Sequence, residues 1–204
     1  TLDKIAYEKA GIIKRGVPVV IGETNPDIVK VFQNYAMDMN APLWQIDKDF
    51  HVHWSKLEDI TKLTYQSPVR EIKDAPTGLC ASYQRENAGV AIAVIDWLTK
   101  KGIPISEKAI MQGLANAHWP GRFDLISKSP WVLLDSAHNP DGMRRLVENI
   151  DKVTIVLSVA DDKDIQGIVK TLTPHIEEFI ITQFYGKRAM SVEKIKEQVV
   201  LTGI

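Results

Sequence analysis

The stretch LLDSAHNPDGMRRL, residues 133–146, decides how the second half of the chain is expected to fold. It continues the apolar run that starts at Trp131, a pattern typical of a buried strand, and the run stops at the acid Asp135. Asn139 has the short polar side chain of a helix N-cap, and Pro140 has the fixed φ favoured at a first helical position. The stretch therefore predicts a strand, a loop that holds Asp135 and His138, and then a helix.

The same order of elements continues toward the C-terminus. Residues 153–160 (VTIVLSVA) predict a second strand, followed by a helix from about residue 165. Residues 179–184 (FIITQF) predict a third strand, followed by a helix from about residue 191. Strands that alternate with helices favour right-handed βαβ units and a parallel sheet, so an α/β fold is expected. We expect the domain to begin near residues 118–122, where Pro120-Gly121 predicts a turn.

The first half of the chain has a less regular pattern. The predicted helices are residues 1–15 with Gly11 as a C-terminal stop, a helix that begins at Asn25-Pro26, residues 82–100 and residues 106–117. Residues 17–23 predict a buried strand, and 43–46 with 50–54 predict a hairpin. Residues 55–78 are polar and predict a turn-rich segment that ends in Ala75-Pro76-Thr77-Gly78.

Asp135 and His138 lie where an open parallel sheet binds its ligands, at the carboxyl end of a strand. An acid there can accept hydrogen bonds from ribose hydroxyls or hold water around a cation. A histidine can donate to a phosphate, and a helix N-terminus offers backbone N–H groups to an anion. A purely structural explanation is also open, in which Asn139 caps the helix and Asp135 is an ordinary acidic loop residue that binds no ligand. The spacing of these residues alone slightly favours this structural explanation.

Composition limits the classes of partner. The 204 residues are 45% hydrophobic and 25% charged with a net charge of −1, which gives no reason to expect nucleic acid or an anionic membrane. The single cysteine, Cys80, excludes an intramolecular disulfide framework and favours an intracellular, cytoplasmic protein. No apolar run approaches the roughly 20 residues that cross a bilayer. Since Thr1 is not preceded by methionine, we expect a piece of a longer protein.

The sequence lacks the glycine-rich motifs of nucleotide-binding loops, and it contains only a two-histidine pattern that could indicate a metal site. The chain has no G-x-x-x-x-G-K-[ST] phosphate loop and no G-x-G-x-x-G motif. His51 and His53 alternate on a predicted strand and could bind a metal together. A solvated strand face is the favoured interpretation, because no third ligand lies nearby in the sequence.

Four longer motifs occur in a characteristic order: IAYEKAGIIK at 5–14, YQRENA at 83–88, WPGRFDLI at 119–126 and DSAHNPDG at 135–142. With them, the chain resembles the folylpolyglutamate synthase/dihydrofolate synthase branch of the Mur-type ATP-dependent amide ligases across essentially all of its length. The resemblance implies that residues 1–119 are the C-terminal part of a P-loop-type central ATPase domain. Residues 120–204 would be a Rossmann-like Mur ligase C-terminal domain that is cut short.

The resemblance also implies an activity. Such a ligase uses ATP to phosphorylate a carboxylate, and an amine then attacks the acyl phosphate to form an amide. The expected substrates are ATP, L-glutamate, and a folate or dihydropteroate, with Mg²⁺ as metal and a monomer as the expected state. The chain alone is expected to be inactive. A noncatalytic nucleotide-binding or interaction module with the ligase fold is the alternative, and an oxidoreductase is disfavoured by the absent glycine motif.

Residue roles carried over from the family concern the nucleotide. Arg122 would reach the ATP from the C-terminal domain and stabilise charge during phosphoryl transfer. Asp135 would contact the nucleotide, and His138 would lie beside the triphosphate and take part in catalysis. Asn87 would bind ATP near the adenine, with Gln84 as a weaker candidate. Without the resemblance, Arg122 could be a hinge arginine, and the two amides could be ordinary residues of the first helical turns.

Lys9, in the EKAGI motif, is implied to be both catalytic and metal-associated. An unmodified lysine would repel magnesium, but carbamylation by carbon dioxide turns it into an anion that can bind or organise Mg²⁺. Carbamylation requires the neutral amine, which burial or a neighbouring cation favours. Without the resemblance, Lys9 would be a solvated helix lysine.

Other charged residues follow the later strands. Asp161, Asp162, Lys163 and Asp164 follow the second predicted strand of the C-terminal half, and Arg188 follows the third. They could line the nucleotide cleft, although loops after strands are often charged in any case. The chain has Ser136 and Ala81 where the family usually has glycine, so the two loops are expected to be shaped somewhat differently.

Overall fold

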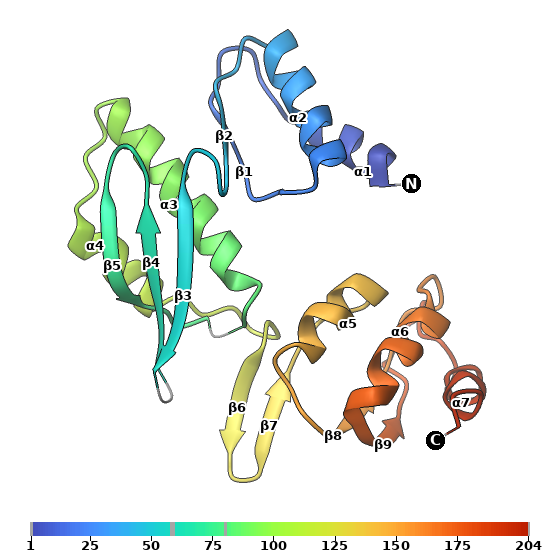
Figure 1. The fold of residues 1–204 in the computed structure, drawn as a ribbon. Coiled ribbons are helices and arrows are strands. Elements are labelled where there is room, and N and C mark those ends of the chain that lie inside the picture. Colours follow the sequence, from blue (N-terminus) through green and yellow to red (C-terminus); the bar gives the residue numbers. More distant parts are fainter. Residues whose placement is uncertain (1, 58–59, 80, 204) are drawn as a thin grey trace. The chain divides into compact units, whose positions relative to one another are not determined.

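The computed structural model describes residues 2–57, 60–79 and 81–203, and the chain divides into two compact units, Thr1–His118 and Trp119–Ile204 (Figure 1). The units have separate hydrophobic cores. Cys80, on which the expectation about disulfides rests, lies outside the described residues. In the part of the chain that is described, no helix has both the length and the apolar character needed to span a bilayer.

The first unit mixes helices with two small sheets. Its elements are α1 (Leu2–Ala10), β1 (Val19–Ile21), α2 (Pro26–Asp38), β2 (Leu43–Gln45), β3 (His51–Leu57), β4 (Ile60–Gln66), β5 (Glu71–Pro76), α3 (Gln84–Lys100) and α4 (Glu107–Ala115). Helix α1 stops just before Gly11, as predicted. The Asn25 side chain caps α2 by accepting a hydrogen bond from the Asp27 N–H at 3.0 Å.

The predicted hairpin of residues 43–46 and 50–54 is wrong. Strand β2 pairs in parallel with β1, and β3 pairs antiparallel with β4. The turn between β2 and β3 sends the chain from one sheet into the next. Asp47 has a φ of 63° there, and Asp49 accepts a hydrogen bond from the Gln45 N–H at 2.9 Å. The short spacing was typical of a hairpin, but the side chains of this turn redirect the backbone.

Residues 55–78 are also not the turn-rich segment that was expected, because they contain most of the sheet β3–β4–β5. The buried side chains Thr61, Leu63 and Tyr65 alternate along β4, which is the period of a strand with one covered face. Helix α3 covers that face (Figure 1). Gly89 permits the close approach, since a Cβ at this position would lie 2.3 Å from Cγ2 of Val52.

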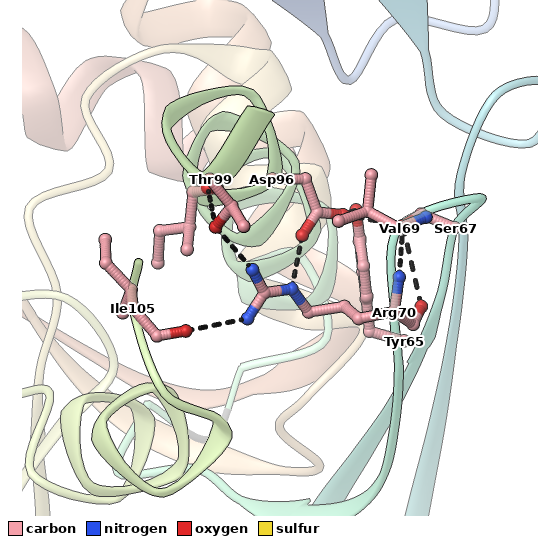
Figure 2. A network of polar contacts seen from close by, with 8 residues as sticks. Tyr65, Ser67, Val69, Arg70, Asp96, Thr99 and Ile105 are labelled. Carbon is pink, nitrogen blue, oxygen red and sulfur yellow. Dashed lines mark hydrogen bonds and ion pairs between the residues drawn. The ribbon is translucent and has the colours of Figure 1, made fainter. Parts of the chain in front are cut away.

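A buried polar network joins this sheet to α3 (Figure 2). The carboxylate of Asp96 is fully buried and accepts hydrogen bonds from the Tyr65 hydroxyl at 2.7 Å and the Ser67 hydroxyl at 2.6 Å. Nε of Arg70 also forms an ion pair with the Asp96 carboxylate. Burial raises the pKa of the Tyr65 hydroxyl, and the hydrogen bond to Asp96 raises it further, so Tyr65 remains a proton donor.

The guanidinium of Arg70 extends the network to the next connection. It donates to the Thr99 hydroxyl at 2.8 Å and to the carbonyl oxygen of Ile105 at 3.2 Å (Figure 2). Thr99 belongs to the end of α3, and Ile105 lies in the segment that leads to α4. One arginine from the β4–β5 turn therefore fixes the place where α3 ends and the chain turns toward α4.

The second unit combines a hairpin with a parallel pair of strands. Its elements are β6 (Asp124–Lys128), β7 (Trp131–Leu134), α5 (Pro140–Val147), β8 (Val153–Leu157), α6 (Ile165–Leu172), the 3₁₀ helix η1 (Thr173–His175), β9 (Ile176–Ile181) and α7 (Val192–Val200). Helices α5 and α6 lie side by side (Figure 1). Met143 of α5, Ile168 of α6 and Ile195 of α7 meet in one core, and the predicted alternation of strands and helices from β7 onward is confirmed.

The expectation for β7 needs a correction. Strand β7 pairs antiparallel with β6, with Asp124 opposite Leu134, whereas the parallel pair is β8–β9. Trp131, Val132 and Leu134 are exposed, so the strand is not buried as predicted, and only Leu133 packs against the core. The apolar run of β7 indicated a strand correctly. Its composition could not show that the partner strand, β6, begins at Asp124, inside the stretch 118–126 that was expected to be a turn into new structure.

We predict that Arg70→Met lowers the free energy of unfolding of the first unit by about 3 kcal/mol, because it leaves the buried Asp96 carboxylate without its cation. Guanidinium denaturation followed by circular dichroism measures the change. The matched control is Lys73→Met, which removes an exposed ion pair with Glu71 and should cost less than about 0.5 kcal/mol. Equal effects of the two substitutions would contradict a structural role for the network.

Candidate functional site

Arg122 projects from a tight turn at the start of the second unit, residues 119–124, which we call the Arg122 turn. The Arg122 N–H donates to the carbonyl oxygen of Trp119 at 3.1 Å, and the Gly121 N–H donates to the Asp124 carboxylate at 3.1 Å. Gly121 and Phe123 both have positive φ, 69° and 50°. Two left-handed residues on either side of Arg122 bend the backbone sharply, and the Arg122 side chain is exposed.

Asp135 holds this turn against the loop that follows β7, residues 135–139, which we call the His138 loop. One carboxylate oxygen accepts the Phe123 N–H at 2.8 Å, and the other accepts the Ala137 N–H at 2.8 Å. The Ser136 N–H adds a backbone bond to the Gly121 carbonyl oxygen, also at 2.8 Å. The structure thus brings together Arg122, Asp135 and His138, three residues that the sequence singled out, on two joined segments.

The ring of His138 is oriented within its own loop. Its Nδ1 lies 2.9 Å from the Ser136 carbonyl oxygen, and because a carbonyl can only accept, Nδ1 is the donor. Asn139 then caps α5 by accepting the Gly142 N–H at 2.7 Å, and Pro140 takes the first helical position, both as predicted. The exposed histidine therefore lies one residue before a capped helix N-terminus.

These features favour an anion as ligand. Arg122 offers a planar set of N–H donors, which suits phosphate oxygens. His138 adds a ring next to the start of α5, where the helix dipole also favours negative charge. Because Arg122 and His138 are both exposed, a phosphate group could approach them without a rearrangement of the core.

Asn87 and Gln84 lie in the first turns of α3, in the other unit. The Asn87 amide donates to the Gln84 side-chain oxygen at 2.9 Å, and Gln84 is only 7% exposed while Asn87 is exposed. Both line a half-open, mostly apolar cavity of about 350 Å³, whose other walls include Ile95 of α3 and Leu114 of α4. A mostly apolar lining that includes two amide side chains is suited to a flat ring with polar edges.

Lys9 lies in the last turn of α1 and is exposed. His51 and His53 occupy one exposed face of β3, as their alternation predicted. Within residues 2–57, 60–79 and 81–203, no three His, Cys, Asp or Glu side chains gather closely enough to hold a metal ion. His51 and His53 are both exposed side chains on that face.

The charged loops after β8 and β9 are tied to each other by exposed ion pairs. Arg188 contacts both carboxylate oxygens of Asp162, at 2.9 and 3.1 Å, and this contact holds the pKa of Asp162 below its ordinary value. Lys194, which the sequence analysis did not single out, pairs with Asp161 at 2.7 Å. Asp164 caps α6 through the Gly167 N–H at 2.9 Å. These contacts give the acids structural roles.

Comparison with known families now bears on this arrangement. Residues 121–203 match the family model described as Mur ligase, glutamate ligase domain. By this match, residues 121–203 are similar to the glutamate ligase domain of the Mur ligases. The matched part begins within the Arg122 turn, at Gly121, and includes the His138 loop.

Relatives by sequence extend over most of the chain. The chain is 34% identical over 180 residues to the dihydrofolate synthase/folylpolyglutamate synthase of Bacillus subtilis, a match that covers 84% of this chain and 42% of the relative. The folylpolyglutamate synthase of Lacticaseibacillus casei is also 34% identical over 180 residues, with 85% and 42% covered. The chain thus spans less than half the length of these relatives.

Solved structures are similar over nearly all of the chain. The Mycobacterium tuberculosis folylpolyglutamate synthase complexed with ADP has a TM-score of 0.88 at 30% identity, covering 97% of this chain and 46% of that one. The folylpolyglutamate synthase of Thermotoga maritima has a TM-score of 0.80 at 32% identity, covering 98% and 49%. These comparisons confirm the α/β fold and the resemblance read from the four motifs.

We predict that Asn139→Ala lowers the free energy of unfolding of the second unit by about 1 kcal/mol, because it removes the acceptor that caps α5. Urea denaturation measures the loss. Asn139→Asp keeps an oxygen acceptor at the same position and should preserve the stability. An alanine variant as stable as the unaltered chain would contradict the capping role.

Proposed function

We propose that this chain belongs to an ATP-dependent ligase that joins L-glutamate to a folate through an acyl phosphate, and that the same protein can also form dihydrofolate from dihydropteroate. The observation that carries the proposal is the placement of Arg122 and His138 on two segments that Asp135 joins, in the part of the chain that matches the Mur ligase domain. The relatives named as folylpolyglutamate synthases support the substrate class. We assign residues 1–119 to the end of the central ATPase domain and 120–204 to the C-terminal domain.

Phosphoryl transfer from ATP to a carboxylate concentrates negative charge on the transferred group. Fixed cations and N–H donors supply most of the stabilisation in such reactions. In this proposal Arg122 binds the phosphates and stabilises the charge that develops, and His138 donates a hydrogen bond beside the triphosphate. Asp135 belongs to the same nucleotide-binding segment. Asn87 binds the adenine, with Gln84 holding the Asn87 amide in place.

Magnesium and Lys9 form the second part of the proposal. A solved relative from Yersinia pestis is complexed with AMPPNP and a manganese ion, which supports a divalent metal in this family of enzymes. When bound, the ion would neutralise phosphate charge. The EKAGI motif is the basis on which we assign Lys9 to the metal, as a carbamate.

The remaining partners follow from the same proposal. ATP, L-glutamate and a folate or dihydropteroate are the small-molecule substrates, and the enzyme acts as a monomer in the cytoplasm. The net charge of −1 provides no attraction to nucleic acid or to an anionic membrane.

We predict that Arg122→Ala, placed in the full-length protein, lowers the turnover of glutamate ligation by at least about tenfold, because it removes a charge-stabilising donor. Steady-state release of phosphate, measured with folate and glutamate present, gives the rate. The matched control is Arg144→Ala in α5, since Arg144 is an exposed arginine paired only locally, with Asp141 at 3.0 Å. A wild-type rate in Arg122→Ala would remove this residue from the mechanism.

A separate prediction concerns Lys9. Full-length protein equilibrated with ¹³C-labelled bicarbonate should show a carbamate signal in its ¹³C NMR spectrum. Lys9→Arg should abolish the signal, because arginine stays protonated and is not a nucleophile. Lys4→Arg, an exposed lysine on the same helix, should leave the signal intact. A signal that survives Lys9→Arg would assign the carbamate to another lysine or to none in this chain.

A further inference from the structure

We propose that Gln84 determines which nucleotide base the site accepts, because its side chain fixes the orientation of the Asn87 amide. This inference rests on the proposed function, in which Asn87 contacts the adenine, and it adds the residue that selects adenine over a purine with an oxygen at C6. Gln84 is then a positioning residue, which acts on the base through Asn87.

The two amides form one hydrogen-bonded pair in the first turns of α3. Nδ2 of Asn87 donates to Oε1 of Gln84 at 2.9 Å, and residues three apart are neighbours on the surface of a helix. Gln84 is only 7% exposed, whereas Asn87 is exposed. Because packing restricts a buried side chain more than an exposed one, Gln84 is the fixed member of the pair, and Asn87 takes its orientation from it.

The hydrogen bond makes the two orientations of the Asn87 amide unequal. If this amide alone turned over, its oxygen would replace its nitrogen beside Oε1 of Gln84. Two acceptors would then face each other, and the buried Gln84 oxygen would lose its donor, which is costly in a place with little access to water. Gln84 therefore favours the orientation in which Asn87 directs an N–H group toward it.

This orientation decides what Asn87 can offer to a ligand. The bond to Gln84 uses one N–H of Asn87 and none of the capacity of its oxygen, which remains an acceptor. Adenine has a donating amino group at C6, next to ring nitrogens that accept, and this edge matches an amide oxygen and N–H. A base with a carbonyl at C6 would instead bring a second acceptor to the Asn87 oxygen.

The surroundings of the pair strengthen the selection. Gln84 and Asn87 line the mostly apolar cavity whose walls include Ala91 and Ile95 of α3 and Leu114 of α4. Apolar side chains offer no substitute partner to a polar group of the base that the amide fails to match. A site of this kind rejects a mismatched ligand because polar groups are left unpaired in the complex. The orientation of one amide can thus have a large effect on base selectivity.

Nucleotide selectivity of the full-length ligase tests the inference. The measured quantity is the ratio of kcat/KM for ATP to that for inosine triphosphate, which has oxygen in place of the amino group at C6. Gln84→Met keeps the length of the side chain but removes the acceptor, so the Asn87 amide can take both orientations. We expect the ratio to fall by at least about tenfold, because inosine triphosphate gains the hydrogen bond that the fixed amide denies it.

The way in which the ratio changes separates positioning from structural damage. KM for ATP should rise while KM for inosine triphosphate falls, because the base contact is made equally in the ground state and the transition state. General damage to the site would raise both values. A ratio in Gln84→Met equal to that of the unaltered enzyme would overturn the inference.

A conservative variant and a control complete the test. Gln84→Glu retains a side chain that accepts the Asn87 N–H, so its ratio should stay within about threefold of the unaltered value. The matched control is Gln112→Met, since Gln112 is an exposed glutamine of α4 that does not line the cavity, and its ratio should be unchanged. Equal losses of selectivity in Gln84→Met and Gln84→Glu would overturn the positioning role.

Asn87→Ala distinguishes a failure of this inference from a failure of the proposed function. It removes the base contact itself, so KM for ATP should rise by at least about tenfold. If KM rises in this variant but Gln84→Met leaves the selectivity ratio unaltered, only the inference is overturned. An unchanged KM in Asn87→Ala would overturn the assignment of Asn87 to the adenine, and the inference with it.

Discussion

The carboxylate of Asp135 spans two segments of the second unit and hydrogen-bonds to the backbone of both. Because its partners are the N–H groups of Phe123 and Ala137, the Arg122 turn and the His138 loop behave as one structural piece. Neither segment belongs to the interior of a helix or a strand, so neither would be rigid through backbone pairing alone. In the proposed site, the placement of the Arg122 guanidinium and the His138 imidazole therefore depends on this acid and on the Ser136–Gly121 backbone bond beside it.

In the first unit, a buried ion pair joins two segments that are separate in sequence. Arg70 and Asp96 connect the β4–β5 turn to α3, and Tyr65 and Ser67 satisfy the remaining capacity of the carboxylate. A buried acid is tolerated only when it is compensated in this way. The network fixes the C-terminal half of α3, and the same helix carries Asn87 in its first turns, so a rigid α3 gives the proposed adenine contact a stable base.

Much of the fold could be predicted from local pattern. Helix α3, the stop of α1 at Gly11, the caps Asn25 and Asn139, and the strand β8 followed by a helix all depend on residues close in sequence. The errors concern pairing. The partner of β7 is β6 and the partner of β2 is β1, and such choices depend on contacts between segments that no local window contains. The alternation of buried residues along β4 is a strand signal, but the polar residues of the 55–78 stretch favoured a turn-rich segment.

For the candidate site as well, the sequence indicated the residues but not their long-range contacts. The motifs selected Arg122, Asp135 and His138, and the structure brings all three onto joined segments. The pattern did not indicate how Asp135 is used, because an acid after a strand looks the same whether it faces a ligand or its own backbone. The buried acid Asp96 could have been noticed, since it interrupts an apolar stretch of α3. Its partner Arg70 is 26 residues away and could be found only from the structure.

The central proposal is that Arg122 binds the phosphates from a turn that the Asp135 carboxylate joins to the His138 loop. The most direct measurement is a crystal structure of the full-length protein with a nonhydrolysable ATP analogue and magnesium. We predict the Arg122 guanidinium within hydrogen-bonding distance of a phosphate oxygen, with the Asp135 carboxylate still accepting the Phe123 and Ala137 N–H groups. An Arg122 side chain turned away from the phosphates, or an Asp135 carboxylate that no longer accepts those two N–H groups, would contradict the account.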